Sequence, residues 1–140
     1  MVCLIFSIIK NVKVMRKQVG SGSLWEDIVG YSRAVRVGNI IEVSGTTAMD
    51  GDQLVGKDDV YAQTKHIFEK VEKALQQLGG SLNDVVRTRM FVTNIDEWEL
   101  VGKAHGEIFS VIKPVTSMVE VKRLINADML IEIEVTAMIV

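Results

Sequence analysis

The last part of the chain alternates between apolar and polar residues in two stretches, 116–121 and 130–140. In the second stretch the apolar side consists of Ile131, Ile133, Val135, Ala137 and Ile139. Alternation with a period of two is typical of a strand that buries one face. We therefore expect two adjacent strands, with Glu120 on the first and Glu132 and Glu134 on the second. Three acids on neighbouring strands indicate a candidate cleft, although each acid alone is typical of a solvated strand position.

A strand pair and a long helix are expected in the first half of the chain. Gly38-Asn39 separates two apolar runs, and both residues tolerate the positive φ of a two-residue hairpin turn. Further on, apolar residues recur close to every 3.6 positions over 60–78, which predicts a helix. Asp58 or Asp59 is expected to cap this helix, and Gly79-Gly80 follows its end.

Residues 85–93 alternate again and predict a strand. Arg87 and Arg89 share one face of it, and buried charges on that face need partners. The segments 20–27 and 50–57 contain glycines and acidic residues without regular periodicity, so they are expected to be loops.

A second helix is expected between Asp96, as its cap, and Pro114, which cannot continue it. Trp98 and His105 lie on its apolar stripe. His105 is interpreted as a packed histidine, with a catalytic role as the alternative. His66, on the first helix, lies beside the apolar stripe and is expected to be solvated.

The elements follow one another as three strands, a helix, a strand, a helix and two strands. This order predicts an α+β fold in which two helices pack on one face of a mixed sheet. The 140 residues fit a single domain, which we place at residues 15–140. Residues 1–14 are interpreted as an upstream extension that is not part of the native protein, because Met15 is a plausible start. An extra edge strand or a tail is the alternative.

Composition narrows the classes of partner. A net charge of −2 and a pI near 5.7 provide no basic surface for a phosphate backbone, so nucleic acid is not expected. The apolar run over residues 1–9 is too short to span a bilayer.

The single Cys3 cannot form an internal disulfide, and one cysteine with two histidines predicts no metal site. We expect a cytoplasmic protein without a cofactor. Its 48% hydrophobic content favours a homo-oligomer.

Three segments together resemble one known family. They are GYSRAVRVGNIIEVSG at 30–45, VVRTRMFVTNIDEW at 85–98, and PVTSMVEVKRL with IEIEVTA at the C-terminal end. They are similar to the Rid family, the reactive intermediate deaminases formerly called YjgF and also labelled endoribonuclease L-PSP. The resemblance implies a chorismate mutase-like fold with a six-stranded sheet, and a homotrimer whose sheets form a central barrel. It also implies clefts between subunits in which enamines and imines such as 2-aminoacrylate are hydrolysed to 2-oxo acids and ammonia.

The resemblance also implies roles for individual residues. Tyr31 matches the cleft tyrosine of the family, Ser44-Gly45 its strand-end pair, and Glu132 the glutamate that positions water. Thr116 stands where deaminating members have the arginine that binds the substrate carboxylate, and a hydroxyl cannot replace that planar fork of donors. Gly102 stands where the family has a cleft asparagine. The chain therefore resembles an arginine-lacking branch.

Hydrolysis of an imine needs a positioned water and a hydrogen-bond donor to the reacting nitrogen or the developing charge. The candidate catalytic residues are Glu132, Tyr31 and Glu120. The candidate substrate-binding residues are Ser44, Gly45, Arg89, His105, Thr116 and Met118. Arg89 is expected to form an ion pair with Glu120. The leading hypothesis is a deaminase, the second a trimer that binds a small metabolite without turnover, and the third a ribonuclease.

Overall fold

The structure is a computed structural model, and it describes residues 14–140. The expected extension at 1–14 therefore lies outside the described residues except for Val14. In chain order the elements are β1 (Arg16–Val19), α1 (Leu24–Val29), β2 (Ala34–Val37), β3 (Ile40–Thr46), β4 (Met49–Asp50), β5 (Gln53–Leu54), α2 (Val60–Gln77), η1 (Leu82–Asp84), β6 (Val85–Val92), η2 (Ile95–Glu97), α3 (Trp98–Phe109), β7 (Val115–Glu120) and β8 (Ile131–Met138).

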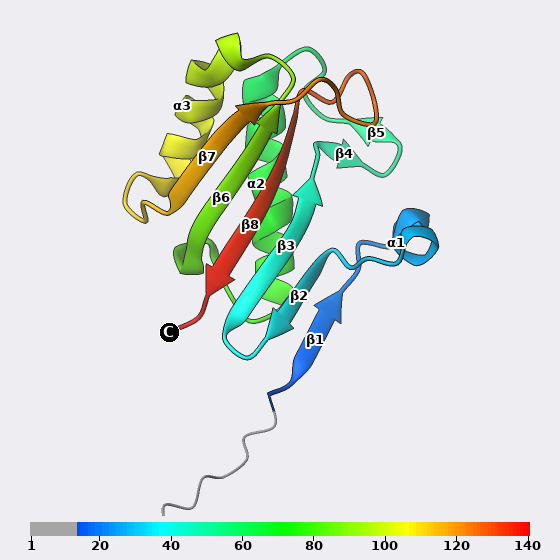
Figure 1. The fold of residues 1–140 in the computed structure, drawn as a ribbon, viewed down its shortest axis with the longest axis vertical. Coiled ribbons are helices and arrows are strands. Elements are labelled where there is room, and N and C mark those ends of the chain that lie inside the picture. The colour runs from blue at the N-terminus through cyan, green and yellow to red at the C-terminus, as the bar shows by residue number, and fades with distance from the viewer. Residues whose placement is uncertain (1–13) are drawn as a thin grey trace, which may run out of the picture.

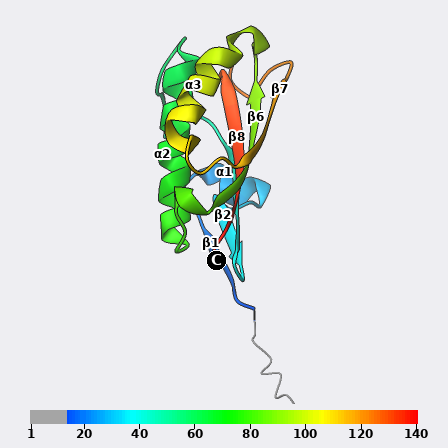
Figure 2. The same cartoon turned by 90° about the vertical axis from the view of Figure 1, so that its left-hand side faces the viewer.

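A single six-stranded sheet with the order β1-β2-β3-β8-β6-β7 forms the centre of the fold. Neighbouring strands are antiparallel except β6 and β7, which are parallel. Helices α2 and α3 lie on the same face of the sheet (Figure 2), and within residues 14–140 no helical layer covers the other face. The predicted α+β fold with a mixed six-stranded sheet and two helices is confirmed. Within residues 14–140, no helix is long and apolar enough to cross a membrane.

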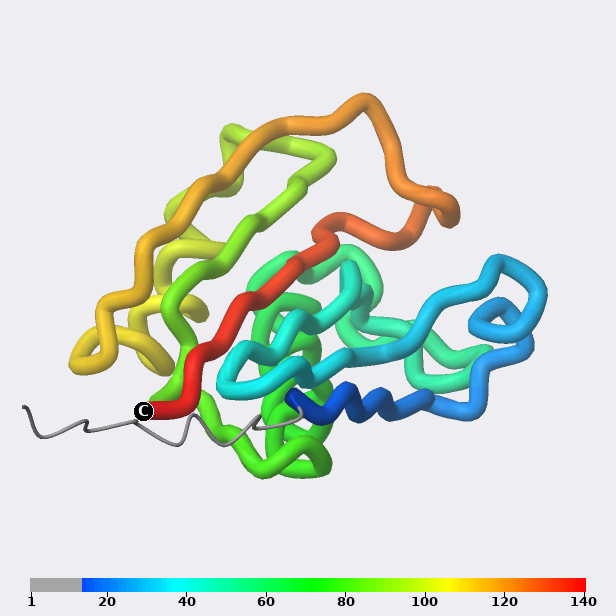
Figure 3. The backbone as a smooth tube through the Cα atoms, turned by 60° about the horizontal axis from the view of Figure 1, so that its bottom comes forward, coloured from blue at the N-terminus to red at the C-terminus, as the bar shows by residue number. Residues whose placement is uncertain are grey.

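The expected adjacency of the two C-terminal strands is wrong, because β6 lies between β7 and β8. The parallel crossover through α3 places β7 on the outer side of β6. The chain between β7 and β8 then makes a wide loop and returns β8 to the centre of the sheet (Figures 1 and 3). Alternation within a strand indicates its two faces but carries no information about its neighbours.

The predicted hairpin and first helix are both present. Val37 pairs with Ile40, and the turn between them uses a positive φ at Gly38 alone, so Asn39 does not need one. Asp59, rather than Asp58, caps α2 by accepting a hydrogen bond from the backbone N–H of Ala62 at 2.9 Å.

Two predicted loops contain short regular elements. Over 20–27 the chain starts the helix α1, because the Ser23 side chain accepts from the backbone N–H of Trp25. Gly30, with a φ of 83°, ends that helix. In the second loop the chain forms the small hairpin of β4 and β5, over residues 49–54.

The second helix also begins differently from the prediction. Asn94, not Asp96, provides the cap, by accepting a hydrogen bond from the backbone N–H of Asp96 at 3.1 Å. One turn of 3₁₀ helix, η2, then precedes α3. Trp98 is 55% exposed and does not share the packed face with Val101, Ala104 and Phe109, which are buried.

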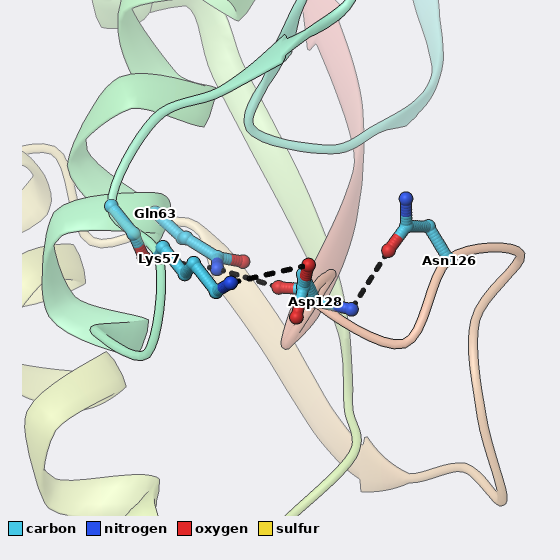
Figure 4. A network of polar contacts seen from close by, with 5 residues as sticks. Lys57, Gln63, Asn126 and Asp128 are labelled. Atoms are coloured by element: carbon cyan, nitrogen blue, oxygen red, sulfur yellow. Dashed lines mark hydrogen bonds and ion pairs between the residues drawn. The ribbon is translucent and has the colours of Figure 1, made fainter.

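A buried glutamine fixes the loop that leads into β8. Gln63 on α2 is fully buried, and its amide nitrogen donates to the backbone carbonyl of Asp128 at 2.9 Å. Its amide oxygen accepts from the backbone N–H of Leu130 at 2.9 Å. Figure 4 shows this contact together with Asn126, which accepts from the Asp128 backbone, and Lys57, which approaches the Asp128 carboxylate. Gln63 therefore positions the residues immediately before Glu132.

Candidate functional site

The candidate site residues lie on both faces of the sheet. Ile131 and Ile133 are fully buried beneath the helices, so Glu132 between them points to the open face. Thr116 pairs with Thr88, which is fully buried on the helical side, so the two threonines share that face. Glu132 and Thr116 therefore cannot meet within one chain.

Four candidates gather on or beside the open face, at the end of β3 and the start of β2. A β-bulge between Val43 and Thr46 turns the chain at Ser44 and Gly45. The Ser44 hydroxyl donates to the carbonyl of Ser32 at 2.7 Å, which connects β3 to the residue after Tyr31. Glu132 lies directly against Gly45, since a Cβ at position 45 would be 2.0 Å from its Oε1 atom.

Arg33 is a further residue of this group, which the sequence did not single out. Its Nη2 donates to the carbonyl oxygen of Gly45 at 2.7 Å. Burial lowers the pKa of Arg33, while Tyr31, Glu26 and Glu132 act in the opposite direction. A single charged residue before a short strand has no pattern that would distinguish it from a solvated one.

The environment of Glu132 favours its protonated form. Partial burial raises the pKa of this carboxyl above its usual value, and the neighbouring Glu134 raises it further. The charge of Arg33 partly opposes both effects. Perturbed carboxyl groups of this kind are enriched at functional sites.

Two open hollows are lined by members of this group. One, of about 650 Å³, is lined by Tyr31 and Ser44 together with several carboxylates, namely Glu26, Asp27, Glu42 and Glu134. The other, of about 690 Å³, is lined by Glu132 and by the loop residues Arg123, Leu124, Ile125 and Ala127. A small ligand in either hollow would lie close to Glu132 or to the Tyr31 and Ser44 hydroxyls.

A second group lies on the helical side of the sheet. The Thr88 hydroxyl is 2.9 Å from Nε2 of His105 and donates to the Thr116 hydroxyl at 2.7 Å. Burial lowers the pKa of His105, which is packed against Phe68 and Phe109. His105 is thus a packed histidine that also connects, through Thr88, to the exposed Thr116.

Met118 belongs to neither group. It pairs with Met90, which is buried, and it packs against the core on the helical side. Its placement favours a structural contribution over contact with a ligand near Glu132.

The ion pair expected between Arg89 and Glu120 is not the one formed. Arg89 lies opposite Glu134 on β8, with 3.7 Å between its Nη1 and Oε2 of Glu134. Glu120 pairs with Val92 and accepts a hydrogen bond from the backbone N–H of Ile95 at 2.9 Å. Glu120 is therefore on the other face from Glu132, where it satisfies an N–H group at the start of η2.

His66 also differs from its expected place. Its side chain is only 15% exposed and lies 3.7 Å from Asp50 and 3.4 Å from Glu69, measured between nitrogen and oxygen atoms. The hairpin of β4 and β5 brings Asp50 over the helix, which a helical periodicity alone could not indicate. Among residues 14–140, no group of three or more His, Cys, Asp or Glu side chains is arranged to hold a metal ion.

Comparison with known proteins is consistent across sequence and structure. A family model described as Endoribonuclease L-PSP matches residues 24–139. The 3-aminoacrylate deaminase RutC of Acinetobacter baylyi is 33% identical over 104 residues, which are 74% of this chain and 82% of that protein.

Two solved structures of similar proteins extend the comparison to the fold. Rv2704 from Mycobacterium tuberculosis, a member of the YjgF/YER057c/UK114 family, superimposes with a TM-score of 0.82 at 48% identity, covering 89% of this chain and all of that one (100%). YyfA from Yersinia pestis, of the Rid protein family, gives a TM-score of 0.78 at 29% identity, with 89% and 100% covered.

Proposed function

Because the chain belongs to the Rid family, also known as the YjgF or endoribonuclease L-PSP family, we propose that it hydrolyses a small reactive enamine or imine to a carbonyl compound and ammonia. The observation that carries the proposal is the placement of Glu132. Its half-buried carboxyl lies against the Gly45 backbone and lines one hollow, while Ser44, the residue before Gly45, lines the other hollow together with Tyr31. This arrangement provides an acceptor for water and the neutral hydroxyl of Tyr31 as a donor.

The reaction needs both kinds of group. In its ionised form Glu132 accepts a hydrogen bond from water and takes a proton as the water attacks the imine carbon. The proton that Glu132 takes from the water is delivered to the nitrogen, which gives an aminoalcohol. The aminoalcohol hydroxyl then loses its proton, which also goes to the nitrogen, and the C–N bond breaks as the carbonyl forms and ammonia leaves. The Tyr31 hydroxyl is the available donor to the nitrogen or to the developing charge, because the Ser44 hydroxyl already donates to the Ser32 carbonyl.

The proposal includes assembly into a homotrimer with the site between subunits. Thr116 and His105 are on the opposite side of the sheet from Glu132, so only a neighbouring subunit could bring these groups into one cleft. The open sheet face also exposes apolar side chains without a helical layer, including Val37, Val115, Val119 and Met138. Exposed apolar surface of this kind is typical of a protein interface.

The proposal further places the chain in an arginine-lacking branch of the family. Thr116 carries no charge, and its hydroxyl is already hydrogen-bonded to Thr88. A substrate carboxylate would therefore lack the bidentate partner that an arginine supplies. Turnover of 2-aminoacrylate is expected to be weak, and the preferred substrate is expected to lack a carboxylate at that position.

The test measures ammonia release from freshly generated enamines and imines, with and without a carboxylate, for wild type, Glu132→Gln and Glu99→Gln. Glu99 is an exposed helix residue and serves as the matched control. Glu132→Gln is expected to lower kcat by about 10²-fold or more, as loss of a general base does, while Glu99→Gln does not change it. Equal rates for all three proteins would contradict the proposal.

A second candidate function is binding of a small metabolite without turnover. The absence of charge at Thr116 favours it, because substrate positioning is weakened. Calorimetric binding of a small carbonyl or imine analogue, without ammonia release from any substrate, would support this alternative. A ribonuclease is disfavoured, since four carboxylates line the hollow beside Tyr31 and repel a phosphate backbone.

A further inference from the structure

Arg33 is a partly buried cation to which the proposed reaction assigns no role. Its Nη2 holds the Gly45 carbonyl, and its Nε is buried and has no hydrogen-bond partner among the described residues. Arg33 forms none of the ion pairs found within residues 14–140. A half-buried arginine with one carbonyl partner and a buried, unpaired Nε–H is unfavourable, so its position needs another explanation.

The Gly45 peptide separates Arg33 from Glu132. Any Cβ at position 45 would overlap the Glu132 carboxyl, with 2.0 Å to Oε1 and 2.9 Å to the carboxyl carbon. The carboxyl therefore lies on the backbone of Gly45, and the guanidinium of Arg33 holds the carbonyl of the same residue. Arg33, Gly45 and Glu132 form one contiguous unit.

The charged groups around this unit have opposing effects. Glu134, on the same strand, faces Glu132 with a like charge, and Arg123 lines the hollow beside Glu132 from the loop before β8. Around Arg33 lie Glu26, Tyr31 and Lys70. Of these groups, Arg33 is the cation whose charge acts on the carboxyl of Glu132.

We propose that Arg33 is a positioning residue, which holds Glu132 in place through Gly45 and keeps it ionised so that it can accept a proton from water. Its catalytic consequence rests on the proposed function, whereas its effect on the ionisation of Glu132 does not. Burial and Glu134 both favour the neutral acid, which cannot act as a base. Arg33 supplies the opposing charge without forming a direct pair that would occupy the carboxylate oxygens.

The first experiment follows the side-chain carboxyl carbon of Glu132 by NMR as a function of pH, with the signal assigned by its loss in Glu132→Gln. Arg33→Gln is expected to raise the midpoint, and Arg33→Lys, which keeps the charge, to leave it close to wild type. Arg36→Gln is the matched control, because Arg36 also donates to a backbone carbonyl, that of Leu78, at 2.8 Å. An unchanged midpoint in Arg33→Gln overturns the inference.

A measurement on wild type covers the case in which Arg33→Gln does not fold. The NMR signal of the Arg33 side-chain nitrogen Nε is expected to shift with pH at the same midpoint as the Glu132 carboxyl. An Arg33 signal that does not respond at that midpoint overturns the inference as well.

The pH dependence of kcat/KM separates the inference from the function it rests on. If Glu132 acts as a base, activity is lost as pH falls through its pKa, and Arg33→Gln is expected to move this acidic limb to higher pH. A shifted NMR midpoint without turnover of any substrate would contradict the proposed function and leave the inference standing. Turnover in which Arg33→Gln moves neither the acidic limb of kcat/KM nor the NMR midpoint of Glu132 would contradict the inference and leave the proposed function standing.

Discussion

At the scale of single residues, the environment of Glu132 is unfavourable for folding and useful for chemistry. Its pKa is raised first by burial and then by Glu134. The folded protein therefore binds this proton more tightly than the unfolded chain does. Its contribution to stability is complete below the unfolded pKa and is lost as the pH rises through the folded pKa.

Glu132→Gln is accordingly expected to raise the melting temperature at neutral pH while it removes activity. Glutamine keeps the shape of the side chain without a charge to be desolvated. Calorimetry of both proteins between about pH 4 and 8, the range over which carboxyl groups with raised pKa values titrate, checks this expectation. The same decrease of stability with pH in the variant as in wild type would contradict it.

Thr116→Arg is expected to raise kcat/KM for 2-aminoacrylate by at least about tenfold, because each new charge-assisted bond is worth about 1.5–3 kcal/mol. Thr116→Lys provides the charge without the planar fork and is expected to gain less. Ammonia release from 2-aminoacrylate, measured for wild type, Thr116→Arg and Thr116→Lys, tests both expectations. Wild-type turnover equal to that of Thr116→Arg would mean that another group already binds the carboxylate.

At the scale of elements, the connection into β8 depends on α2. Gln63 joins the helix to the carbonyls of Gly56 and Asp128 and to the N–H of Leu130. Its side chain is fully buried, so the Asp128 carbonyl and the Leu130 N–H would lose these partners without it, whereas the Gly56 carbonyl also accepts from the N–H of Asp59. The start of β8, and with it Glu132, is therefore held by a helix that contributes no residue to the site.

Gln63→Met is expected to destabilise the protein by about 1–3 kcal/mol, because it removes the hydrogen bonds from a buried side chain to the Asp128 carbonyl and the Leu130 N–H. Gln77→Met is the control, since Gln77 is exposed on the same helix and its replacement should cost less than about 0.5 kcal/mol. Urea unfolding of both variants measures the difference. Equal stabilities would show that the loop replaces the Gln63 contacts with others.

At the scale of the whole molecule, the two faces of the sheet differ. One is covered by α2 and α3 (Figure 2). The other carries Glu132, Arg89 and exposed apolar residues, because these positions alternate with the buried ones along their strands. Assembly through the open face would bury these apolar side chains and form clefts between subunits.

A trimer is therefore expected in solution, and Val119→Arg on the open face is expected to dissociate it. Val111→Arg is the control, because Val111 follows α3 and is 91% exposed. Light scattering at micromolar concentration distinguishes the masses. A wild-type monomer would remove the proposed cleft between subunits, and an intact Val119→Arg trimer would place the interface elsewhere.

The sequence by itself predicted the helices and strands whose side chains repeat with a local period. The alternation over 131–138 and the 3.6-residue repeat of α2 each arise from a side chain that points into or away from a core, so the pattern and the structure share one cause. The hairpin at Gly38 and the cap at Asp59 are likewise local, because each depends on residues within a few positions.

Tertiary structure alone decided which strands and side chains meet. Alternation could not indicate that β6 separates β7 from β8, and it therefore misplaced Glu120 beside Glu132 and paired Arg89 with the wrong acid. The role of Arg33 was equally hidden, since it depends on a bulge that brings Gly45 against Glu132. Pairing between distant segments is determined by the packing of the whole chain, because contacts across a sheet join residues far apart in sequence.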